Sequence, residues 1–267
     1  MDDRPIGMFD SGFGGLTVAR ACIDLVPGED LIYMGDTGRY PYGPRPLEEV
    51  RAFALDITRR LVEDFGVKLV VVACNTASAA ALELLRFEFD VPVVGVIEPG
   101  ARSLVRATTN GRVGVIGTVG TIASGAYQRA VASLRAPVTL TTCACPGFVE
   151  FVERGETDSD QVVVLAERLL TPVKEAEVDA LLLGCTHYPF LARTIGDVMG
   201  RDVVLVSSAD ETAFEVRALL GDTGLVRRTA GKGSHRFFSS GDIDWFRQLG
   251  GRLLGPELDE VEAWPWA

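Results

Sequence analysis

Residues 71–76 read VVACNT, and residues 182–187 read LLGCTH. In both stretches an apolar run stops at a small residue, a cysteine and a polar residue. Upstream of them, IGMFDSGFGG (6–15) and VGVIGTVGTI (113–122) also match, because in each an apolar run with glycine second leads to a hydroxyl residue and a glycine-containing turn. The offsets, from residue 6 to 113 and from residue 71 to 182, are 107 and 111 residues. This near-constant spacing predicts two similar halves.

Short apolar runs alternate with helical patterns along the chain. The segment 46–66 is the clearest helix, with apolar residues three and four apart, a proline at its start and a glycine at its stop. This alternation predicts βαβ units in mainly parallel sheets, with ligands bound at the carboxyl ends of the strands. The predicted strands are 6–9, 31–34, 69–73, 93–96, 113–116, 138–142, 180–183, 203–206 and 236–239.

Composition narrows the classes of function. The net charge of −11 argues against a nucleic acid as a direct ligand, since phosphates bind to basic faces. No run approaches about 18 consecutive apolar residues, so no membrane span is expected. The N-terminal MDDRPIGMFD has no basic or apolar region of a signal peptide. We therefore expect a cytoplasmic protein whose five cysteines are free thiols.

The sequence favours chemistry without a cofactor. One Cys-Ala-Cys pair (143–145) and two distant histidines do not make a zinc motif. None of the three lysines (68, 174 and 232) sits where a pyridoxal-phosphate Schiff base is indicated. The loop after residue 9 lacks the third glycine of a dinucleotide site, and Asp10 would repel a pyrophosphate. We expect neither metal nor cofactor.

Cys74 and Cys185 carry the main hypothesis. A single buried cysteine is usually inert, but two at equivalent strand ends are harder to explain by packing. If the halves face each other across a cleft, one thiol removes a proton from a carbon and the other delivers one to its opposite face. A phosphatase loop needs an arginine six residues on, where Ala80 and Leu191 stand. A hydrolytic dyad of His187 with either cysteine would leave the other cysteine unexplained.

Other polar residues at strand ends extend the predicted site. Asp10 suits the ammonium group of a zwitterion, with Ser11 and loop amides serving carboxylates; the alternative is a turn or cap aspartate. The loop GDTGRYPYG (35–43) combines Asp36, Arg39, Tyr42 and Gly43 and is typical of substrate recognition or a lid. Two residues beyond Cys185, His187 either assists that thiol or is a core histidine.

Six motifs in order resemble the cofactor-independent aspartate/glutamate racemase family, and within it the glutamate racemases. They are FDSGFGGLTV, GDTGRYPYG, VVACNTASA, VPVVGVIEPG, GVIGTVGT and LLLGCTHYPFL. The resemblance continues through SSADETA (207–213) and GDIDWFRQLG (241–250). It implies interconversion of L- and D-glutamate without pyridoxal phosphate, metal or nucleotide, which supplies D-glutamate for bacterial peptidoglycan. It also implies two similar α/β domains with the active site in the cleft between them.

Site residues are carried over by the same resemblance. Cys74 and Cys185 would be the two acid/base thiols, assisted by Asp10, His187 and, by a looser match, Glu153. On sequence alone Glu153 looks like a surface glutamate, and its stretch departs from the family pattern at Glu150, where proline or an apolar residue is expected. Gly38 stands where alanine is commoner. The implied substrate-binding residues are Asp10, Ser11, Tyr42, Gly43, Asn75, Thr76, Thr118, Thr186 and His187.

The family organisation implies that one domain is inserted into the other. Residues 1–97 plus 210–267 would form the first domain and 98–209 the second. A homodimer is usual in the family, and some members bind and inhibit DNA gyrase, so both partners are expectations here. Racemisation of another amino acid such as aspartate, or of a hydantoin, is the alternative reading. The length of the substrate side chain is not encoded in any of these motifs.

Overall fold

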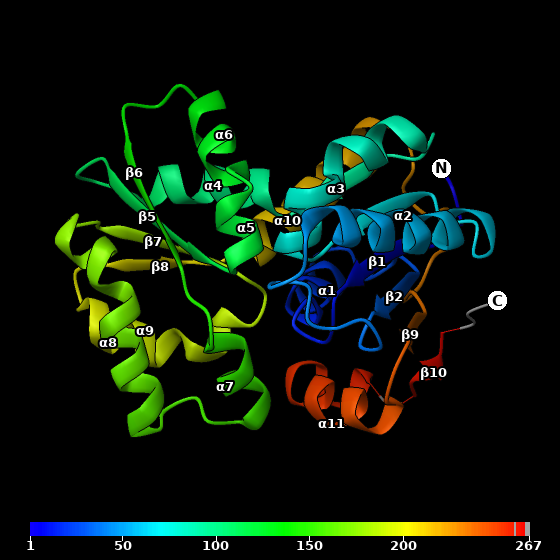
Figure 1. Cartoon of the computed structure of the whole chain (residues 1–267). Helices are drawn as coiled ribbons and strands as arrows, with labels where there is room; N and C mark the ends of the chain where they lie inside the picture. Colours follow the sequence, from blue (N-terminus) through cyan, green and yellow to red (C-terminus); the bar gives the residue numbers. More distant parts are fainter. Residues whose placement is uncertain (259, 265–267) are drawn as a thin grey trace. The chain divides into compact units, whose positions relative to one another are not determined.

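The computed structural model describes residues 1–258 and 260–264. The chain divides into two compact units. Unit 1 comprises Met1–Val96 together with the described residues from Ala209 onward, and unit 2 comprises Ile97–Ser208. Figure 1 follows the chain through both by colour. Each unit holds its own sheet and its own covering helices, so each is described by itself.

Unit 1 is built on a six-stranded parallel sheet in the order β10-β9-β2-β1-β3-β4. Its strands are β1 (Ile6–Asp10), β2 (Leu31–Gly35), β3 (Leu69–Val72), β4 (Val93–Gly95), β9 (His235–Ser239) and β10 (Glu262–Ala263). Its helices are α1 (Leu16–Leu25), α2 (Leu47–Glu63), α3 (Asn75–Glu88), α10 (Ala209–Asp222), α11 (Ile243–Leu254) and the short 3-10 helix η2 (Gly255–Glu257).

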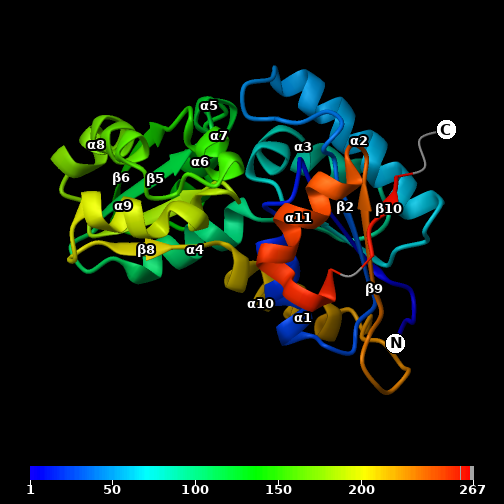
Figure 2. The ribbon, with the colours of Figure 1, turned by 90° about the horizontal axis from the view of Figure 1, so that it is seen from below.

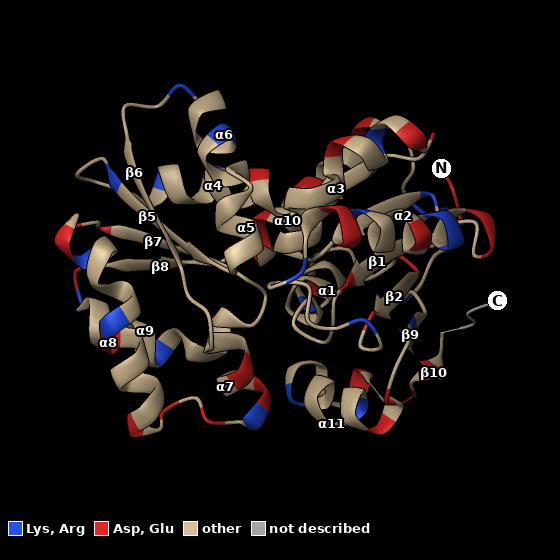
Figure 3. Cartoon of the chain, viewed as in Figure 1, with Lys and Arg blue, Asp and Glu red and all other residues tan. Residues whose placement is uncertain are grey.

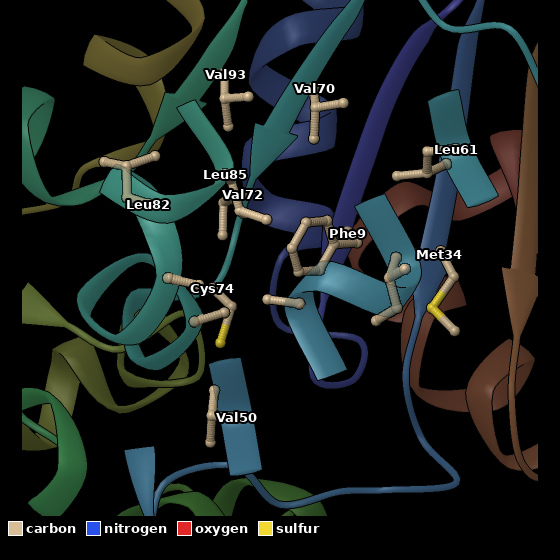
Figure 4. Packing of buried hydrophobic residues seen from close by; sticks show 14 of the residues in the cluster. Phe9, Met34, Val50, Leu61, Val70, Val72, Cys74, Leu82, Leu85 and Val93 are labelled. Carbon is tan, nitrogen blue, oxygen red and sulfur yellow. The ribbon is translucent and has the colours of Figure 1, made fainter. Parts of the chain in front are cut away.

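The core of unit 1 explains why these strands read as continuous apolar runs. Every residue of β1, β2 and β3 is buried, because helices cover both faces of the sheet. Figure 2 shows α2 and α3 on one side of the sheet and α1 and α11 on the other. Under α2 and α3, alternate strand residues such as Phe9, Val70 and Val72 pack against Leu61 and Leu85 (Figure 4).

Helix α2 confirms the prediction made from residues 46–66. Its buried positions fall three and four residues apart and face the sheet: Val50, Ala54, Ile57, Thr58 and Leu61. Pro46 is the N-cap, and the chain reverses at Gly66, whose φ is +60°. The last residue of the helix is Glu63, so the helix is shorter than the predicted segment 46–66.

Unit 2 has a four-stranded parallel sheet in the order β6-β5-β7-β8. The strands are β5 (Arg112–Gly117), β6 (Thr139–Ala144), β7 (Ala180–Gly184) and β8 (Val204–Val206). Helices α4 and α6 lie on one side of the sheet and α8 and α9 on the other (Figure 1). The helices are α4 (Ile97–Ala107), α5 (Val119–Ala123), α6 (Ala126–Ser133), α7 (Phe148–Arg154), α8 (Asp160–Glu175), η1 (Tyr188–Leu191) and α9 (Ala192–Met199).

The two sheets share one winding order, which confirms the predicted α/β class with two similar parallel halves. The run β2-β1-β3-β4 in unit 1 corresponds position by position to β6-β5-β7-β8 in unit 2. The matching sequence stretches fall on equivalent strands, with β1 paired to β5 and β3 paired to β7. All nine predicted strands are present, whereas β10 was not predicted because it consists of only two residues.

The winding order also identifies where each unit can bind a ligand. From β1 the chain adds β2 on one side and then β3 on the other, so the order reverses between β1 and β3. In unit 2 the equivalent reversal lies between β5 and β7. Open α/β sheets bind ligands at the carboxyl ends of the strands that flank such a switch point. Asp10 and Cys74 occupy this position in unit 1, and Thr118 and Cys185 occupy it in unit 2.

Charged side chains are spread over the helices (Figure 3). In that view lysine and arginine positions are separated by acidic and uncharged ones and form no continuous basic stripe among the described residues. No helix within the described part of the chain is both long and apolar enough to cross a membrane.

Candidate active site

Asp10 is the last residue of β1 and is fully buried. One carboxylate oxygen accepts a 2.7 Å hydrogen bond from the backbone N–H of Gly15, at the start of α1. A side chain at position 15 would have no room, because a Cβ there would lie 2.6 Å from the Asp10 Cβ and 2.8 Å from the Tyr33 hydroxyl. Gly15 therefore lets the helix start approach and fix the carboxylate.

Cys74 lies two residues beyond β3 and is the N-cap of α3. Its Sγ is 3.8 Å from the Oγ of Ser11, and that hydroxyl lies 3.4 Å from an Asp10 carboxylate oxygen. Burial first, and then the charge of Asp10, raise the pKa of the Cys74 thiol well above its ordinary value. Both effects favour the neutral thiol at Cys74.

Asn75 and Thr76 form the first turn of α3, directly after Cys74. Both are buried, with 3% of each residue exposed. The first turn of a helix presents backbone N–H groups that have no partner within the helix, and these suit a carboxylate. The carboxyl end of β3 thus joins a thiol to a site of anion-binding character.

The loop after β2 is organised by Asp36, a fully buried carboxylate. It accepts hydrogen bonds from the hydroxyl of Tyr42, from the Ser240 hydroxyl at 2.6 Å and from the Arg39 guanidinium at 2.6 Å. Its own N–H donates to the Asp10 carbonyl at 2.9 Å. The Tyr42 hydroxyl is thus engaged by Asp36.

Cys185 directly follows β7 and is 6% exposed. Its Sγ lies 4.0 Å from the Nδ1 of His187, and the Thr186 Oγ1 lies 3.5 Å from the same nitrogen. Gly184 before it has no room for a side chain, since a Cβ would lie 2.6 Å from the Ile116 carbonyl oxygen. Cys185, Thr186 and His187 therefore form one buried cluster, as the sequence predicted.

Tyr188 holds the turn that carries this cluster. Its N–H donates to the Cys185 carbonyl at 3.1 Å, and its hydroxyl donates to the Cys145 carbonyl at 3.0 Å. Its fully buried ring packs edge-on against Phe148, with centroids 5.4 Å apart. No local sequence pattern marks Tyr188 for this role, because its partners at 145 and 148 are distant in the chain.

Thr118 and Glu153 are the remaining residues of the predicted site. The Thr118 hydroxyl caps α5 by accepting the N–H of Thr121 at 3.2 Å, and the two hydroxyls are 2.9 Å apart. Glu153 is half-buried on α7, a helix that packs against η1 directly after His187.

Two clusters thus emerge, one in each unit. Unit 1 brings together Asp10, Ser11, Cys74, Asn75 and Thr76, and unit 2 brings together Cys185, Thr186 and His187. Asp36 and Ser240 support the first cluster, but Ser240 sits in an ordinary turn sequence and gave no signal of this role. The described residues contain no group of three or more cysteine, histidine or acidic side chains arranged to hold a metal ion.

The chain is similar to known proteins over nearly its whole length. Residues 14–215 match the family model described as Asp/Glu/Hydantoin racemase. The chain is 54% identical to a glutamate racemase of Acidothermus cellulolyticus, over 98% of this chain and 99% of that one. Among solved structures, a glutamate racemase isoform of Bacillus anthracis superimposes with a TM-score of 0.93 at 40% identity, covering 99% and 98% of the two chains. A Francisella tularensis glutamate racemase in complex with D-glutamate gives 0.92 at 32% identity, with the same coverage.

Proposed function

This chain belongs to the Asp/Glu/Hydantoin racemase family, and we propose that it interconverts L- and D-glutamate by proton transfer between two thiols. One observation carries the mechanism. Cys74 and Cys185 follow equivalent strands of two sheets with the same winding order, and each is next to buried polar side chains. Two equivalent thiols suit a reaction whose forward and reverse directions are mirror images.

The proton balance is simple. One cysteine, as a thiolate, removes the Cα proton, and the other, as a thiol, donates a proton to the opposite face. The protein ends with the two protonation states exchanged, and the reverse reaction restores them. A thiolate is a weak base for a Cα–H, so fixed donors must stabilise the carbanion. The first turn of α3, with Asn75 and Thr76, and the Thr186 hydroxyl are the groups proposed for this task.

Substrate binding itself is proposed to activate Cys74. The negative charge of Asp10 helps to keep the pKa of this thiol high. When the ammonium group of glutamate binds to Asp10, the two charges offset each other and the thiol ionises more readily. Ser11, within 3.8 Å of the sulfur and 3.4 Å of the carboxylate, provides a route for the proton between them.

His187 is proposed to serve Cys185 in the same way. Its Nδ1 is the ring nitrogen nearest to that sulfur, at 4.0 Å, so the imidazole can accept the thiol proton and stabilise the thiolate. Glu153 is proposed to assist from α7, which packs against the segment following His187.

The mechanism requires both thiols to reach one carbon from opposite faces. We therefore propose that residues 1–97 with 210–267 form one domain, that residues 98–209 form the inserted domain, and that each domain supplies one of the two thiols. Excluding water from the reacting carbon would strengthen the electrostatic stabilisation of the carbanion. The backbone of Tyr42 and Gly43 is proposed to contact the bound glutamate.

One experiment tests the proposed reaction directly. The purified chain is incubated with L-glutamate in D2O without pyridoxal phosphate, and the Cα proton signal and the optical rotation are followed. We expect the Cα proton to be replaced by deuterium while the rotation decays to zero. Parallel reactions with L-aspartate and a hydantoin test the alternative substrates. No exchange with any of them would rule out racemisation, and faster exchange with aspartate would reassign the substrate.

Three further expectations rest on the family resemblance. We propose that the chain acts in the cytoplasm to supply D-glutamate for peptidoglycan, and that it forms a homodimer. Light scattering across a concentration series tests the dimer by its mass. Contact with DNA gyrase is tested by supercoiling assays in which a Cys74→Ser/Cys185→Ser double variant replaces the wild type. Inhibition by both proteins would support a contact independent of catalysis, and inhibition by neither would exclude it.

A further inference from the structure

A second pair of thiols lies at the carboxyl end of β6, outside the candidate active site. Cys143 belongs to the strand and Cys145 follows its last residue, so in this extended stretch the two side chains point to the same side. Cys143 is half-buried, whereas Cys145 is 1% exposed. The two thiols are close enough to shift each other's pKa values, and the Cys145 Sγ also lies 4.0 Å from the Cys143 carbonyl oxygen. The Cys143 sulfur is thus partly exposed, and the Cys145 sulfur beside it is hidden.

The surroundings of the pair give its members different protonation states. The Cys143 thiol lies 3.0 Å from the Leu169 carbonyl, which favours the protonated form. The neighbouring Cys145 thiol outweighs this contact and lowers the pKa of Cys143 to about 7. The pKa of Cys145 is raised by the neighbouring Cys143 and by burial. Near neutral pH a fraction of Cys143 is therefore thiolate while Cys145 stays a hidden thiol, the usual arrangement of a reactive and a resolving cysteine.

We propose that Cys143 and Cys145 form a modification site, at which Cys143 reacts with a small peroxide and Cys145 converts the product into a reversible disulfide. In the first step the Cys143 thiolate attacks one oxygen of hydrogen peroxide, the O–O bond breaks, and hydroxide leaves. In the second, the Cys145 sulfur attacks the Cys143 sulfenic acid and water leaves. Two thiols lose two electrons, and one peroxide takes up those electrons and two protons to become two waters.

The backbone makes this disulfide possible but strained. Residues two apart on an extended strand have Cα atoms roughly 6.6 Å apart, near the upper limit of about 6.8 Å that a disulfide spans. Closure must therefore draw Cys145 toward Cys143. Regular pairing of β6 ends at Ala144 and the chain turns at Gly147, whose φ is +94°, so the movement has to stretch only the last bond to β5, from the Cys145 N–H to the Gly117 carbonyl at 2.9 Å. Strained disulfides are the more easily reduced ones, so dithiothreitol should reverse the modification.

Movement of Cys145 is transmitted to Cys185. The Cys145 carbonyl accepts a hydrogen bond from the Tyr188 hydroxyl at 3.0 Å. The Tyr188 N–H in turn donates to the Cys185 carbonyl at 3.1 Å. Drawing Cys145 away weakens the anchor of the turn that presents Cys185 and His187. Oxidation of the pair should therefore slow racemisation, a consequence that rests on the proposed function.

The site is tested chemically, without reference to activity. The reduced full-length chain is treated with a few equivalents of hydrogen peroxide at pH 7, alkylated with N-ethylmaleimide and digested with trypsin. Mass spectrometry then examines the peptide 136–154, whose only cysteines are 143 and 145. We expect this peptide to lose two hydrogens, to escape alkylation, and to recover both thiols with dithiothreitol. If it remains doubly alkylated while other cysteines are oxidised, the proposal is overturned.

Single substitutions assign the two roles. Cys145→Ser should stop at a sulfenic acid on Cys143, trapped by dimedone, whereas Cys143→Ser should leave Cys145 unoxidised. Cys22→Ala, which removes a buried thiol elsewhere, is the matched control and should form the 143–145 disulfide normally. Far-UV circular dichroism confirms that each variant is folded. Rapid oxidation of Cys145 in the Cys143→Ser variant would contradict the assigned order.

An activity measurement tests whether the disulfide between Cys143 and Cys145 slows racemisation. Wild type should lose most of its racemase rate on mild oxidation and recover it with dithiothreitol, whereas Cys143→Ser should resist. A disulfide formed without loss of rate would overturn the coupling to Cys185. If the fully reduced protein has no racemase activity, the proposed function fails, while the mass measurement still decides the thiol pair.

Discussion

The Oγ of Ser11 lies 3.8 Å from the Sγ of Cys74, although 63 positions separate the two residues. Ser11 follows β1 and Cys74 follows β3, the two strands that flank the switch point of unit 1. The same hydroxyl lies 3.4 Å from the Asp10 carboxylate. A thiol whose pKa is raised is therefore connected, through one hydroxyl, to the group that contributes to raising it.

Cys74→Ser and Cys185→Ser should each abolish racemisation. A serine hydroxyl is a far weaker acid than a thiol, and loss of a positioned acid or base typically lowers rates by about 10² to 10⁴. Each single variant should still catalyse exchange or elimination from one enantiomer, because one thiol remains. Proton NMR in D2O with each enantiomer measures this. Cys22→Ala is the control and should keep its activity; equal loss in the control would indicate misfolding instead.

Ser11→Ala should lower kcat/KM for glutamate by about two- to tenfold, since a hydrogen bond of this kind contributes about 0.5–1.5 kcal/mol. The free energy of unfolding should hardly change, because a hydrogen atom replaces the hydroxyl and no new crowding results. Coupled assays of D-glutamate formation and urea denaturation give the two quantities. Ser11→Thr, which keeps the hydroxyl, should retain more activity. An alanine variant with wild-type kcat/KM would remove Ser11 from the proton route.

Asp10→Asn should shift the pH dependence of activity as well as reduce the rate. Burial and the Asp10 charge both raise the pKa of Cys74, and asparagine removes only the charge. The pKa of Cys74 should therefore fall, and the acidic limb of kcat/KM should move to lower pH in the direction for which Cys74 is the base. The pH profile of each direction is measured separately. A limb that stays in place or moves to higher pH contradicts this electrostatic link.

Thr118→Ala should reduce the free energy of unfolding by about 1 kcal/mol, since its hydroxyl caps α5. If the hydroxyl also contacts glutamate, as the family resemblance implies, KM should rise several-fold. Thr118→Ser keeps the hydroxyl and should restore both stability and KM. Chemical denaturation and steady-state kinetics separate the two roles. A stability loss with an unchanged KM would leave Thr118 as a capping residue only.

Replacing one member of the buried Lys68–Glu29 ion pair should destabilise unit 1 without affecting catalysis. The pair is 2.5 Å apart, with side-chain exposures of 0% and 6%, and Lys68 also donates to the Asp2 carbonyl at 2.7 Å. Lys68→Met leaves a buried carboxylate without its cation, so we expect a loss of about 3–5 kcal/mol. The Lys68→Met/Glu29→Gln double variant should lose less. Guanidinium denaturation measures both, and a double variant less stable than the single one would refute this account.

The sequence by itself determined the secondary structure and the repeat. Strand positions follow from short apolar runs, α2 follows from its three- and four-residue spacing, and both are local patterns that a reader can count. The repeated cysteine motifs also located both thiols, because parallel sheets place the residue after each strand at the ligand-binding edge. The motifs also contain the polar residues directly after each thiol, Asn75 and Thr76 in one and Thr186 and His187 in the other.

Only the tertiary structure decided which distant residues support those clusters. Asp36 accepts the hydroxyl of Ser240, and Tyr188 donates to the Cys145 carbonyl, across 204 and 43 positions. The order of the strands sets such pairs, and no local pattern records that order: β9 was predicted as a strand, but its place between β10 and β2 was not. Periodicity reports which side of an element is buried, whereas hydrogen bonds between loops depend on which elements become neighbours.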